Sequence, residues 1–394
     1  MKLIYIVNAR IPTEKAHGIQ IMKMCEAFVD ANNANQDTNI ANKIDVELVV
    51  PQRRNNIIKD PFEYYGIEKK FKITKLPCLD LIPLGLGAFG FYVQQFSFSF
   101  AAAAYSLFKK NVVFYSRDIL PCFFLGLLGK GFFLELHRLS KKEKLFYSFV
   151  FKRAKGIIST NNFKAEYIKN NYKISGKKIL VYPNGFDQSL FDITLDKNSL
   201  REQLSLFNNK PIIMYTGHLY GWKGAHVLAQ AAKLITEANF YFIGGTDSDI
   251  ADFKKKYSGE NLFFLGRKPF YEIPKYQKAA DVLVLPNSAE SEESRNDTSP
   301  IKLFEYMASG RPIVASDLPS IREILNNANS LLVEPDDPEE LSDGIKKILE
   351  DKGPPERIAN QALIDSREYT WKNRARKIID FINYCDNFTN IIKL

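Results

Sequence analysis

The chain has 394 residues, of which 45% are hydrophobic and 25% are charged. This length allows two or three domains that each bury a core, and the composition argues against a disordered chain. The formal net charge is +9 at pH 7. The four cysteines are scattered, with no C-x-x-C pair and no paired Cys/His spacing. This pattern argues against a disulfide framework or a structural metal and indicates reduced thiols in a cytoplasmic protein.

The positive charge is concentrated in the first half of the chain. Residues 1–190 hold 28 Lys and Arg against 15 Asp and Glu, a net of +13, whereas the remainder holds 26 against 30, a net of −4. A basic N-terminal half favours an anionic partner, which is a membrane surface, a lipid-phosphate acceptor or nucleic acid, and the alternative is a solvated basic face without a specific partner. No aromatic RNA-binding motif or zinc motif is present, so nucleic acid is not expected. We expect peripheral contact with an anionic membrane, at the inner face of the cytoplasmic membrane.

The first predicted elements are a strand, a loop and a helix. Lys2–Val7 is an apolar run typical of a buried parallel strand, and because the chain runs straight into it we expect no signal peptide. The loop Asn8–Gly18 follows, and then an amphipathic helix from Ile19 to about Ala31. A glycine beside a helix N-terminus lets the backbone approach a phosphate closely, although the full G-x-G-x-x-G motif is absent.

The stretch Leu81–Phe108 contains no charged residue and is long enough to span a bilayer. Its first third is broken by Pro83, Gly85 and Gly87, and polar residues such as Gln94 occur in the rest. We therefore favour a loop followed by a helix buried in the N-terminal domain. The alternatives are an apolar surface that contacts a membrane or a lipid acceptor, and a true membrane span.

His137 follows the predicted strand Phe132–Leu136 directly. Ligands of open α/β sheets bind beyond the carboxyl ends of strands, so His137 is a candidate, although a lone histidine is more often structural. A basic helix, Lys141–Lys155, comes next, and a turn at Pro183-Asn184-Gly185 closes this half. Residues 186–210 are interpreted as a linker.

A second series of strands and helices begins at the strand Pro211–Thr216. The glycine-rich loop after it contains His218 and Lys223, and a lysine there can pair with a phosphate or simply face solvent. Two more strands lead into a loop that contains Arg267 and into an acidic loop that ends at Asp297. Two such series predict an α/β protein with two Rossmann-like domains, 1–190 and 191–370.

The acidic loop leads into a predicted three-turn helix. Ser299 is a good N-cap, Pro300 suits the first helical position, and Gly310 ends the helix before the strand Pro312–Ser316.

The first turn of this helix can bind a phosphate. The amides of Ile301 and Lys302 have no partner inside the helix, and the Lys302 ammonium adds a full charge. Glu305, one turn further, can accept two hydrogen bonds from a ribose diol, and Asp297 can receive a substrate hydroxyl. The alternative is an ordinary capped helix in which Ser299 uses these amides and Glu305 faces solvent.

This stretch resembles the E-x7-E signature of the retaining GT4-type glycosyltransferases, which have the GT-B fold. The resemblance implies two Rossmann-like domains that face each other across a cleft, with residues 371–394 crossing back to the first domain. In that family the Glu matching Glu305 holds the nucleotide ribose, and the acid matching Asp297 contacts the donor sugar. The residues between them bind the sugar and phosphates, which implies that Ser299, Ile301 and Lys302 do so here.

The resemblance also assigns roles outside the signature. It implies that Gly18 faces the donor phosphates and that His137 lies close to the donor sugar and the reaction centre. It implies that Lys223 pairs with the diphosphate and takes part in catalysis, and that the loop of Arg267 lies against the nucleotide base. His218 stands where many members have an arginine, so the phosphates would be held less tightly or more pH-dependently.

The implied function is transfer of a sugar from a nucleotide-diphosphate donor to a cell-envelope glycan or a lipid-linked acceptor, with retention and without a metal or cofactor. Three departures from the family pattern are Asp297 for the usual Glu, Pro300 for a Gly, and His218 for Arg. The first and last keep open a subunit that binds nucleotide sugar without transferring it. A nucleotide-sugar epimerase, a phosphorylase and a membrane-surface protein without catalysis also stay open. The residues do not reveal the base, the sugar, the acceptor, the pathway or the oligomeric state.

Overall fold

The computed structural model describes residues 1–31, 44–139, 144–207, 209–351 and 353–391. The chain divides into two compact units. The first unit comprises Met1–Pro183 and Trp371–Leu394, and the second comprises Asn184–Thr370. The division therefore falls a few residues before the boundary predicted after residue 190.

The first unit is built on one parallel sheet. Its described residues form seven strands in the order β3-β2-β1-β4-β5-β6-β7. The strands are β1 (Lys2–Ile6), β2 (Asp45–Pro51), β3 (Lys72–Leu76), β4 (Val113–Ser116), β5 (Phe132–Leu136), β6 (Gly156–Ser159) and β7 (Ile179–Val181). The strand order reverses between β1 and β4, which is the doubly wound arrangement of a Rossmann-like domain.

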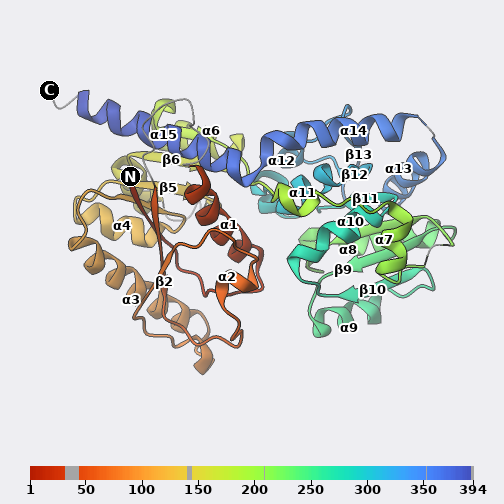
Figure 1. Ribbon diagram of the computed structural model, residues 1–394, viewed down its shortest axis with the longest axis horizontal. Coiled ribbons are helices and arrows are strands. Elements are labelled where there is room, and N and C mark those ends of the chain that lie inside the picture. The colour runs from red at the N-terminus through yellow and green to blue at the C-terminus, as the bar shows by residue number, and fades with distance from the viewer. Residues whose placement is uncertain (32–43, 140–143, 208, 352, 392–394) are drawn as a thin grey trace. The chain divides into compact units, whose positions relative to one another are not determined.

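The helices of the first unit connect these strands, and the last helix of the chain joins them. They are α1 (Ala16–Asp30), α2 (Pro61–Tyr64), α3 (Gly87–Leu107), α4 (Ile119–Leu127), α5 (Lys144–Arg153), α6 (Asn162–Tyr172) and α15 (Trp371–Ile391). In this unit α15 packs against α1 (Figure 1). Residues 371–394 thus return to the unit that holds the start of the chain.

The second unit repeats the plan. Its described residues form a parallel sheet in the order β10-β9-β8-β11-β12-β13. The strands are β8 (Ile212–Thr216), β9 (Asn239–Ile243), β10 (Leu262–Gly266), β11 (Val282–Leu285), β12 (Ile313–Ser316) and β13 (Leu331–Val333). The helices are α7 (Lys197–Gln203), α8 (Ala225–Ala231), α9 (Asp247–Lys256), α10 (Ile273–Ala279), α11 (Ile301–Ser309), α12 (Pro319–Arg322), α13 (Pro338–Glu350) and α14 (Pro354–Ser366). The prediction of two Rossmann-like α/β domains is confirmed.

Residues 186–210 are not a linker, so that prediction is wrong. Phe186, Phe191 and Leu200 are buried in the hydrophobic core of the second unit. The Phe186 backbone N–H also donates to the Tyr369 carbonyl (3.0 Å), which joins the two ends of this unit. The segment contains α7 and therefore forms part of the fold.

Two helices of the first unit differ from their predicted bounds. The helix α1 begins at Ala16 rather than Ile19, so Gly18 lies in its first turn and not in a loop. The predicted basic helix corresponds to α5, which is described from Lys144 to Arg153. Residues 141–143 of that prediction lie outside the described residues.

The uncharged stretch 81–108 forms a short turn at Ile82–Leu84 and then α3. Among the described residues, no helix has the length and apolar character that crossing a membrane requires. The membrane-span alternative is therefore wrong. The favoured alternative is correct only in part, because α3 buries one face and exposes the other.

Candidate functional site

The first turn of α11 carries no side-chain cap, so the prediction that Ser299 caps it is wrong. The helix begins at Ile301, and the residue at its N-cap position is Pro300. Ser299 is held by Asn184, whose backbone N–H donates to the Ser299 hydroxyl (3.1 Å) and whose side-chain amide donates to the Ser299 carbonyl (2.7 Å). The ordinary capped helix therefore does not apply. The amides of Ile301 and Lys302 keep their capacity to bind an anion.

Lys302 extends from α11 to the loop after β8. Its Nζ lies 3.9 Å from the centroid of the Tyr215 ring. A Cβ built on Gly217 would lie 3.4 Å from that Nζ, so the amine lies against the backbone of the loop. Lys302 is 8% exposed, and its Nζ has no hydrogen-bond partner among the described residues. Burying a lysine amine without a partner is costly, and the arrangement therefore indicates an anionic ligand.

Three loops of the second unit come into backbone contact at the carboxyl ends of the strands. A Cβ on Gly244, after β9, would overlap the Gly217 carbonyl, and a Cβ on Gly224 would overlap the Pro286 carbonyl after β11. Both glycines have positive φ, 123° at Gly244 and 72° at Gly224. Because only glycine allows this approach, it brings together the loops at the edge where open α/β sheets bind ligands.

The ionisable side chains at this edge form a cluster of Lys223, Lys302 and Glu305. In all three, the pKa is shifted in the direction that favours the uncharged form. Burial lowers the pKa of Lys223 to about 8. Burial, and then the nearby Lys223 charge, lowers the pKa of Lys302 well below its ordinary value. Burial raises the pKa of Glu305 to about 7, against the opposing effects of Gln277 and Lys302. Such clustered shifts are typical of functional sites.

Two amides that the sequence did not single out belong to this edge. Gln277 in α10 donates from Nε2 to Glu305 Oε2 (3.2 Å) and so orients that carboxyl group. Asn287, just beyond β11, is fully buried, and neither its Nδ2 nor its Oδ1 has a partner among the described residues. A buried amide in this state indicates a ligand or a water. No motif marks either residue, because single amides in a helix or after a proline are common.

The other residues predicted to bind the donor also follow strand ends of the second unit. His218 lies in the loop after β8, and its ring stacks on Tyr220 with centroids 4.8 Å apart. Arg267 is exposed and follows β10. Asp297 ends a π-helical turn, 293–297, between β11 and α11. Their roles stay predictions.

In the first unit, His137 follows β5 as predicted, and its ring is held by Glu135. The His137 Nε2 lies 2.6 Å from Glu135 Oε1. Burial, and then the Arg117 guanidinium, lowers the pKa of His137 to about 4, against the opposing effect of Glu135. The imidazole is therefore neutral at pH 7. In the tautomer whose Nε2–H donates a hydrogen bond to the Glu135 carboxylate, Nδ1 is a hydrogen-bond acceptor.

Glu135 is the centre of a buried network that sequence reasoning missed. Besides His137, its Oε1 accepts from Gln20 Nε2 (2.9 Å) and from Arg374 Nη2 (2.8 Å), and its Oε2 accepts from the Tyr115 hydroxyl. Glu135 and Arg374 are both 0% exposed. Burial alone would raise the pKa of Glu135, but Arg374 and then His137 hold it well below its usual range. The last helix thus supplies the counter-charge for the carboxylate that orients His137.

Gly18 has a packing reason to be glycine. Its backbone N–H donates to the Lys15 carbonyl (2.9 Å), and a Cβ at this position would overlap the Tyr65 hydroxyl and Thr13. The next residue toward the N-terminus, His17, has its pKa lowered to about 4 by burial and then by Arg117. The contact of Gly18 with a phosphate stays a prediction.

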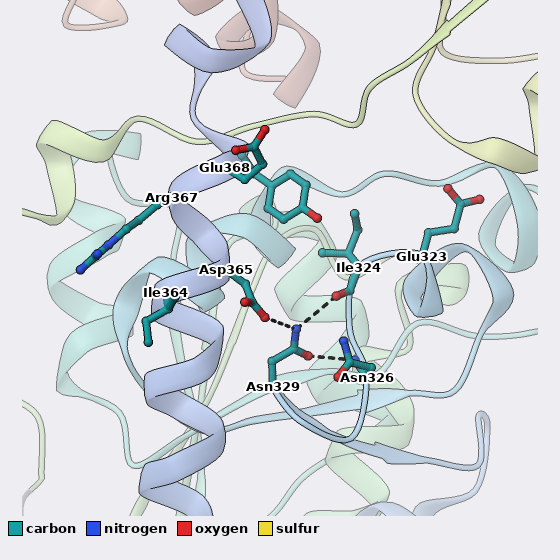
Figure 2. A pocket seen from close by; sticks show the side chains of 9 residues that line it. Glu323, Ile324, Asn326, Asn329, Ile364, Asp365, Arg367 and Glu368 are labelled. Carbon is teal, nitrogen blue, oxygen red and sulfur yellow. Dashed lines mark hydrogen bonds between the residues drawn. The ribbon is translucent and has the colours of Figure 1, made fainter. Parts of the chain in front are cut away.

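An open pocket of about 480 Å³ lies elsewhere in the second unit. Figure 2 shows Asn329 in its wall, donating from Nδ2 to Asp365 Oδ2 (2.8 Å) and to the Ile324 carbonyl (3.2 Å). The loop that lines it leads into β13, so the pocket lies at the amino end of that strand. Ligands of open α/β sheets bind at the opposite edge, and the Asn329 amide satisfies groups of the fold itself.

The second unit resembles known glycosyltransferases in sequence. The sequence profile of the family "Glycosyl transferases group 1" matches residues 210–351, which include β8 to β13. The D-inositol 3-phosphate glycosyltransferase of Xylanimonas cellulosilytica is 27% identical over 239 residues, which are 57% of this chain and 55% of that protein. An N,N'-diacetylbacillosaminyl-diphospho-undecaprenol alpha-1,3-N-acetylgalactosaminyltransferase of Campylobacter jejuni is 26% identical over 230 residues, 57% of this chain and 58% of that protein. The chain thus spans little more than half the length of these relatives.

Solved structures share the whole fold at low sequence identity. HepE of Anabaena in complex with UDP-glucose has a TM-score of 0.73 and 16% identity, over 96% of this chain and 99% of that one. Sucrose-phosphate synthase of Thermosynechococcus elongatus has a TM-score of 0.74 and 18% identity, over 97% and 98%. These findings show that the chain has the GT-B fold of those structures and that residues 210–351 resemble the group 1 glycosyltransferases.

Proposed function

We propose that this protein transfers a sugar from a uridine-diphosphate sugar to a glycan or a lipid-linked acceptor. The observation that carries the proposal is the cluster of Lys223, Lys302 and Glu305 beside the uncapped N-terminus of α11. HepE, whose structures hold UDP and UDP-glucose, supports uridine as the base. The name of the Campylobacter relative, which specifies a diphospho-undecaprenol, supports a lipid-linked acceptor.

The residues of this site can hold each part of such a donor. The two lysines and the amides of Ile301 and Lys302 would bind the diphosphate, because they concentrate positive charge at one end of α11. The Glu305 carboxylate would accept hydrogen bonds from the ribose diol. Asp297 would contact the sugar, and the Arg267 loop would contact the base. His137 stays the proposed active-site residue of the first unit.

We further propose that transfer proceeds with retention and requires no metal, cofactor or side-chain base. The bond between the anomeric carbon and the phosphate oxygen breaks, and its electron pair leaves with the diphosphate. The acceptor oxygen forms the new bond on the same face, and its proton passes to the departing phosphate oxygen. The protein's task is then to stabilise negative charge on the diphosphate, for which Lys223 and Lys302 are suited.

A thermal-shift panel of UDP, GDP, ADP and dTDP and their sugars, without metal, tests the donor. A ligand at about 100 times its Kd stabilises the folded state by about 2.7 kcal/mol, so the matching nucleotide should raise the melting temperature by several degrees. Lys223→Ala should lose about 2–4 kcal/mol of binding free energy. Lys233→Ala removes an exposed lysine of the same unit and should bind like the wild type.

The outcomes separate this proposal from competing functions. UDP binding followed by transfer to a lipid-linked acceptor supports it. Stabilisation by UDP without any turnover identifies a binding subunit, and an isomerised sugar released without acceptor identifies an epimerase. If no nucleotide stabilises the wild type, or if Lys223→Ala binds UDP as well as Lys233→Ala does, the assignment of the donor site is wrong.

Binding of UDP at pH 8 should take up protons. The pKa of Lys223, lowered to about 8, leaves this amine partly deprotonated at pH 8, and a bound diphosphate would raise that pKa as well as the lowered pKa of Lys302. Glu305, with a pKa of about 7, is already ionised and contributes little. Titration calorimetry in two buffers of different ionisation enthalpy measures the uptake. The uptake should fall in Lys223→Met and persist in Lys233→Met, whereas equal heats in both buffers for the wild type would contradict the partly deprotonated state of Lys223.

A further inference from the structure

The helix α3 is inverted relative to the usual amphipathic pattern, in which a helix on the surface turns its apolar stripe inward and its polar side outward. Its polar residues Gln94, Ser99 and Ser106 are 0% exposed. Apolar side chains at helical spacing lie on the opposite side and are more than half exposed: Phe89, Tyr92, Phe96, Phe100 and Leu107.

This orientation is fixed by the interior of the unit. The Gln94 side-chain amide donates to Asn8 Oδ1 (2.8 Å) in the loop after β1. Ser99 and Ser106 donate to carbonyls of their own helix, at 2.7 Å and 2.6 Å. The buried residue Phe98 lies on the same side, in the core with the strands. Rotating the helix to bury its aromatic stripe would break the hydrogen bond between Gln94 and Asn8 and would take Phe98 out of the core.

The apolar stripe continues onto the neighbouring helix. In the first unit α3 and α4 pack side by side (Figure 1). The Phe124 ring of α4 lies 6.4 Å from the Phe96 ring and 6.5 Å from the Phe100 ring, measured between centroids. Leu127 and Leu128, at the end of α4, are 58% and 42% exposed. We call the exposed apolar side chains of α3, together with Phe124, Leu127 and Leu128, the aromatic face. Single exposed apolar side chains are common on soluble domains, but a contiguous apolar surface of this kind marks an interaction site.

Cations lie next to the aromatic face. Lys110 follows α3, Lys130 follows α4, and Lys152 and Arg153 end α5, which packs on α4. The Arg153 guanidinium lies over the Phe149 ring, 5.6 Å from its centroid. No ion pair within the described residues neutralises any of these four cations. Asp118 is the one acidic residue between Asp80 and Glu135 in the sequence, and it accepts from the Asn8 backbone N–H.

We propose that the aromatic face inserts into the interfacial region of an anionic lipid bilayer, with α3 lying in the plane of the membrane. Aromatic side chains suit the boundary between headgroups and acyl chains, and flanking lysines and arginines are attracted to anionic headgroups. A symmetric contact with a second copy would bring like charges together, which disfavours a dimer through this face. The proposal goes beyond the donor site, since none of these residues belongs to it.

Co-sedimentation of the full chain with vesicles, without any nucleotide, tests the proposal. The protein should bind vesicles of phosphatidylcholine mixed with an equal amount of phosphatidylglycerol, bind much less to phosphatidylcholine alone, and dissociate as salt rises. Phe96→Ser/Phe100→Ser should weaken binding by about 10-fold or more. Lys152→Gln/Arg153→Gln should weaken it by about 10-fold on anionic vesicles only.

A matched control comes from the second unit. Leu234→Ser/Ile364→Ser removes two side chains that are 46% and 54% exposed there, and it should leave vesicle binding unchanged. Circular dichroism and melting temperature confirm that each variant is folded. A wild type that does not bind anionic vesicles, or a Phe96→Ser/Phe100→Ser variant that binds as well as the control, overturns the proposal. So does a wild-type dimer in sedimentation velocity that the Phe96→Ser/Phe100→Ser change dissociates. Because no nucleotide is present, failure here leaves the donor assignment untouched.

Discussion

Replacing Arg374 with methionine should lower the free energy of unfolding of the first unit by about 3–5 kcal/mol, the cost of removing one partner of a buried ion pair. The Arg374 guanidinium is the only cation within ion-pair distance of the Glu135 carboxylate in the described part of the chain, apart from the ring of His137. Both side chains are 0% exposed, so water cannot replace the lost charge. The variant leaves an ionised or newly protonated carboxyl group in the core, and either state is costly.

The tryptophans allow each unit to be followed separately. Trp371 begins α15 in the first unit, and Trp222 lies in the second. In a Trp222→Phe background, urea unfolding followed by fluorescence therefore reports on the first unit, which matters because a two-unit chain need not unfold in one step. Arg376→Met is the matched control, since Arg376 is exposed on the same helix and bonds only to Asn373 among the contacts described.

Two further readouts separate the ion pair from a packing effect. Glu135→Gln/Arg374→Met removes both charges and should recover most of the lost stability. In Arg374→Met, the pKa of His137 should rise above about 4, because the guanidinium helps to lower it. A histidine NMR titration measures this shift. A loss of stability equal to that of Arg376→Met would show that the pair contributes nothing to folding.

The sequence predicted the strand ends of this protein well, because apolar β-rich runs and the polar residues after them are local patterns. Phe132–Leu136 and the position of His137 after it are as expected. The helix after Asp297 ends at Gly310, which has φ 66°, and β12 follows it. The edge strands of the first unit were missed, because three of the five residues of β3 are polar (Lys72, Thr74 and Lys75) and β7 has only three residues. Neither looks like a buried strand when read alone.

The contacts that orient the site residues could not be predicted, since they join distant segments. Glu135 and Arg374 are 239 positions apart, and no pattern in a single sequence pairs them. Ser299 has the local chemistry of an N-cap, but Asn184, which is 115 positions away, binds its hydroxyl. For α3 the sequence is apolar on most sides, so periodicity could not decide which face would be buried. In each case a tertiary contact overrode the local preference.

Replacing Glu305 with glutamine should change stability and donor binding in opposite directions. The pKa of Glu305 is raised from 4.5 to about 7, so the folded protein binds this proton more tightly than the unfolded chain does. Stability from this group is therefore present below pH 4.5 and is lost as the pH rises to about 7. The stability of Glu305→Gln relative to the wild type should rise by about 2–3 kcal/mol over that interval and level off above it, after allowance for the partly exposed edge of the carboxyl group.

Donor binding should show the reverse. The amide retains the shape of the carboxyl group but accepts hydrogen bonds less strongly, so UDP binding at pH 8 should weaken by about 2–4 kcal/mol. Urea unfolding of the second unit, followed through Trp222 in a Trp371→Phe background, and UDP titration of the same protein give both numbers. Glu237→Gln, an exposed carboxyl group of the same unit, should change neither. If the variant is more stable at pH 8 and binds UDP poorly, Glu305 contributes to ligand binding and lowers the stability of the unliganded protein. A stability difference independent of pH would mean that this carboxyl group is solvated like any other, and the site would then lose its buried acceptor.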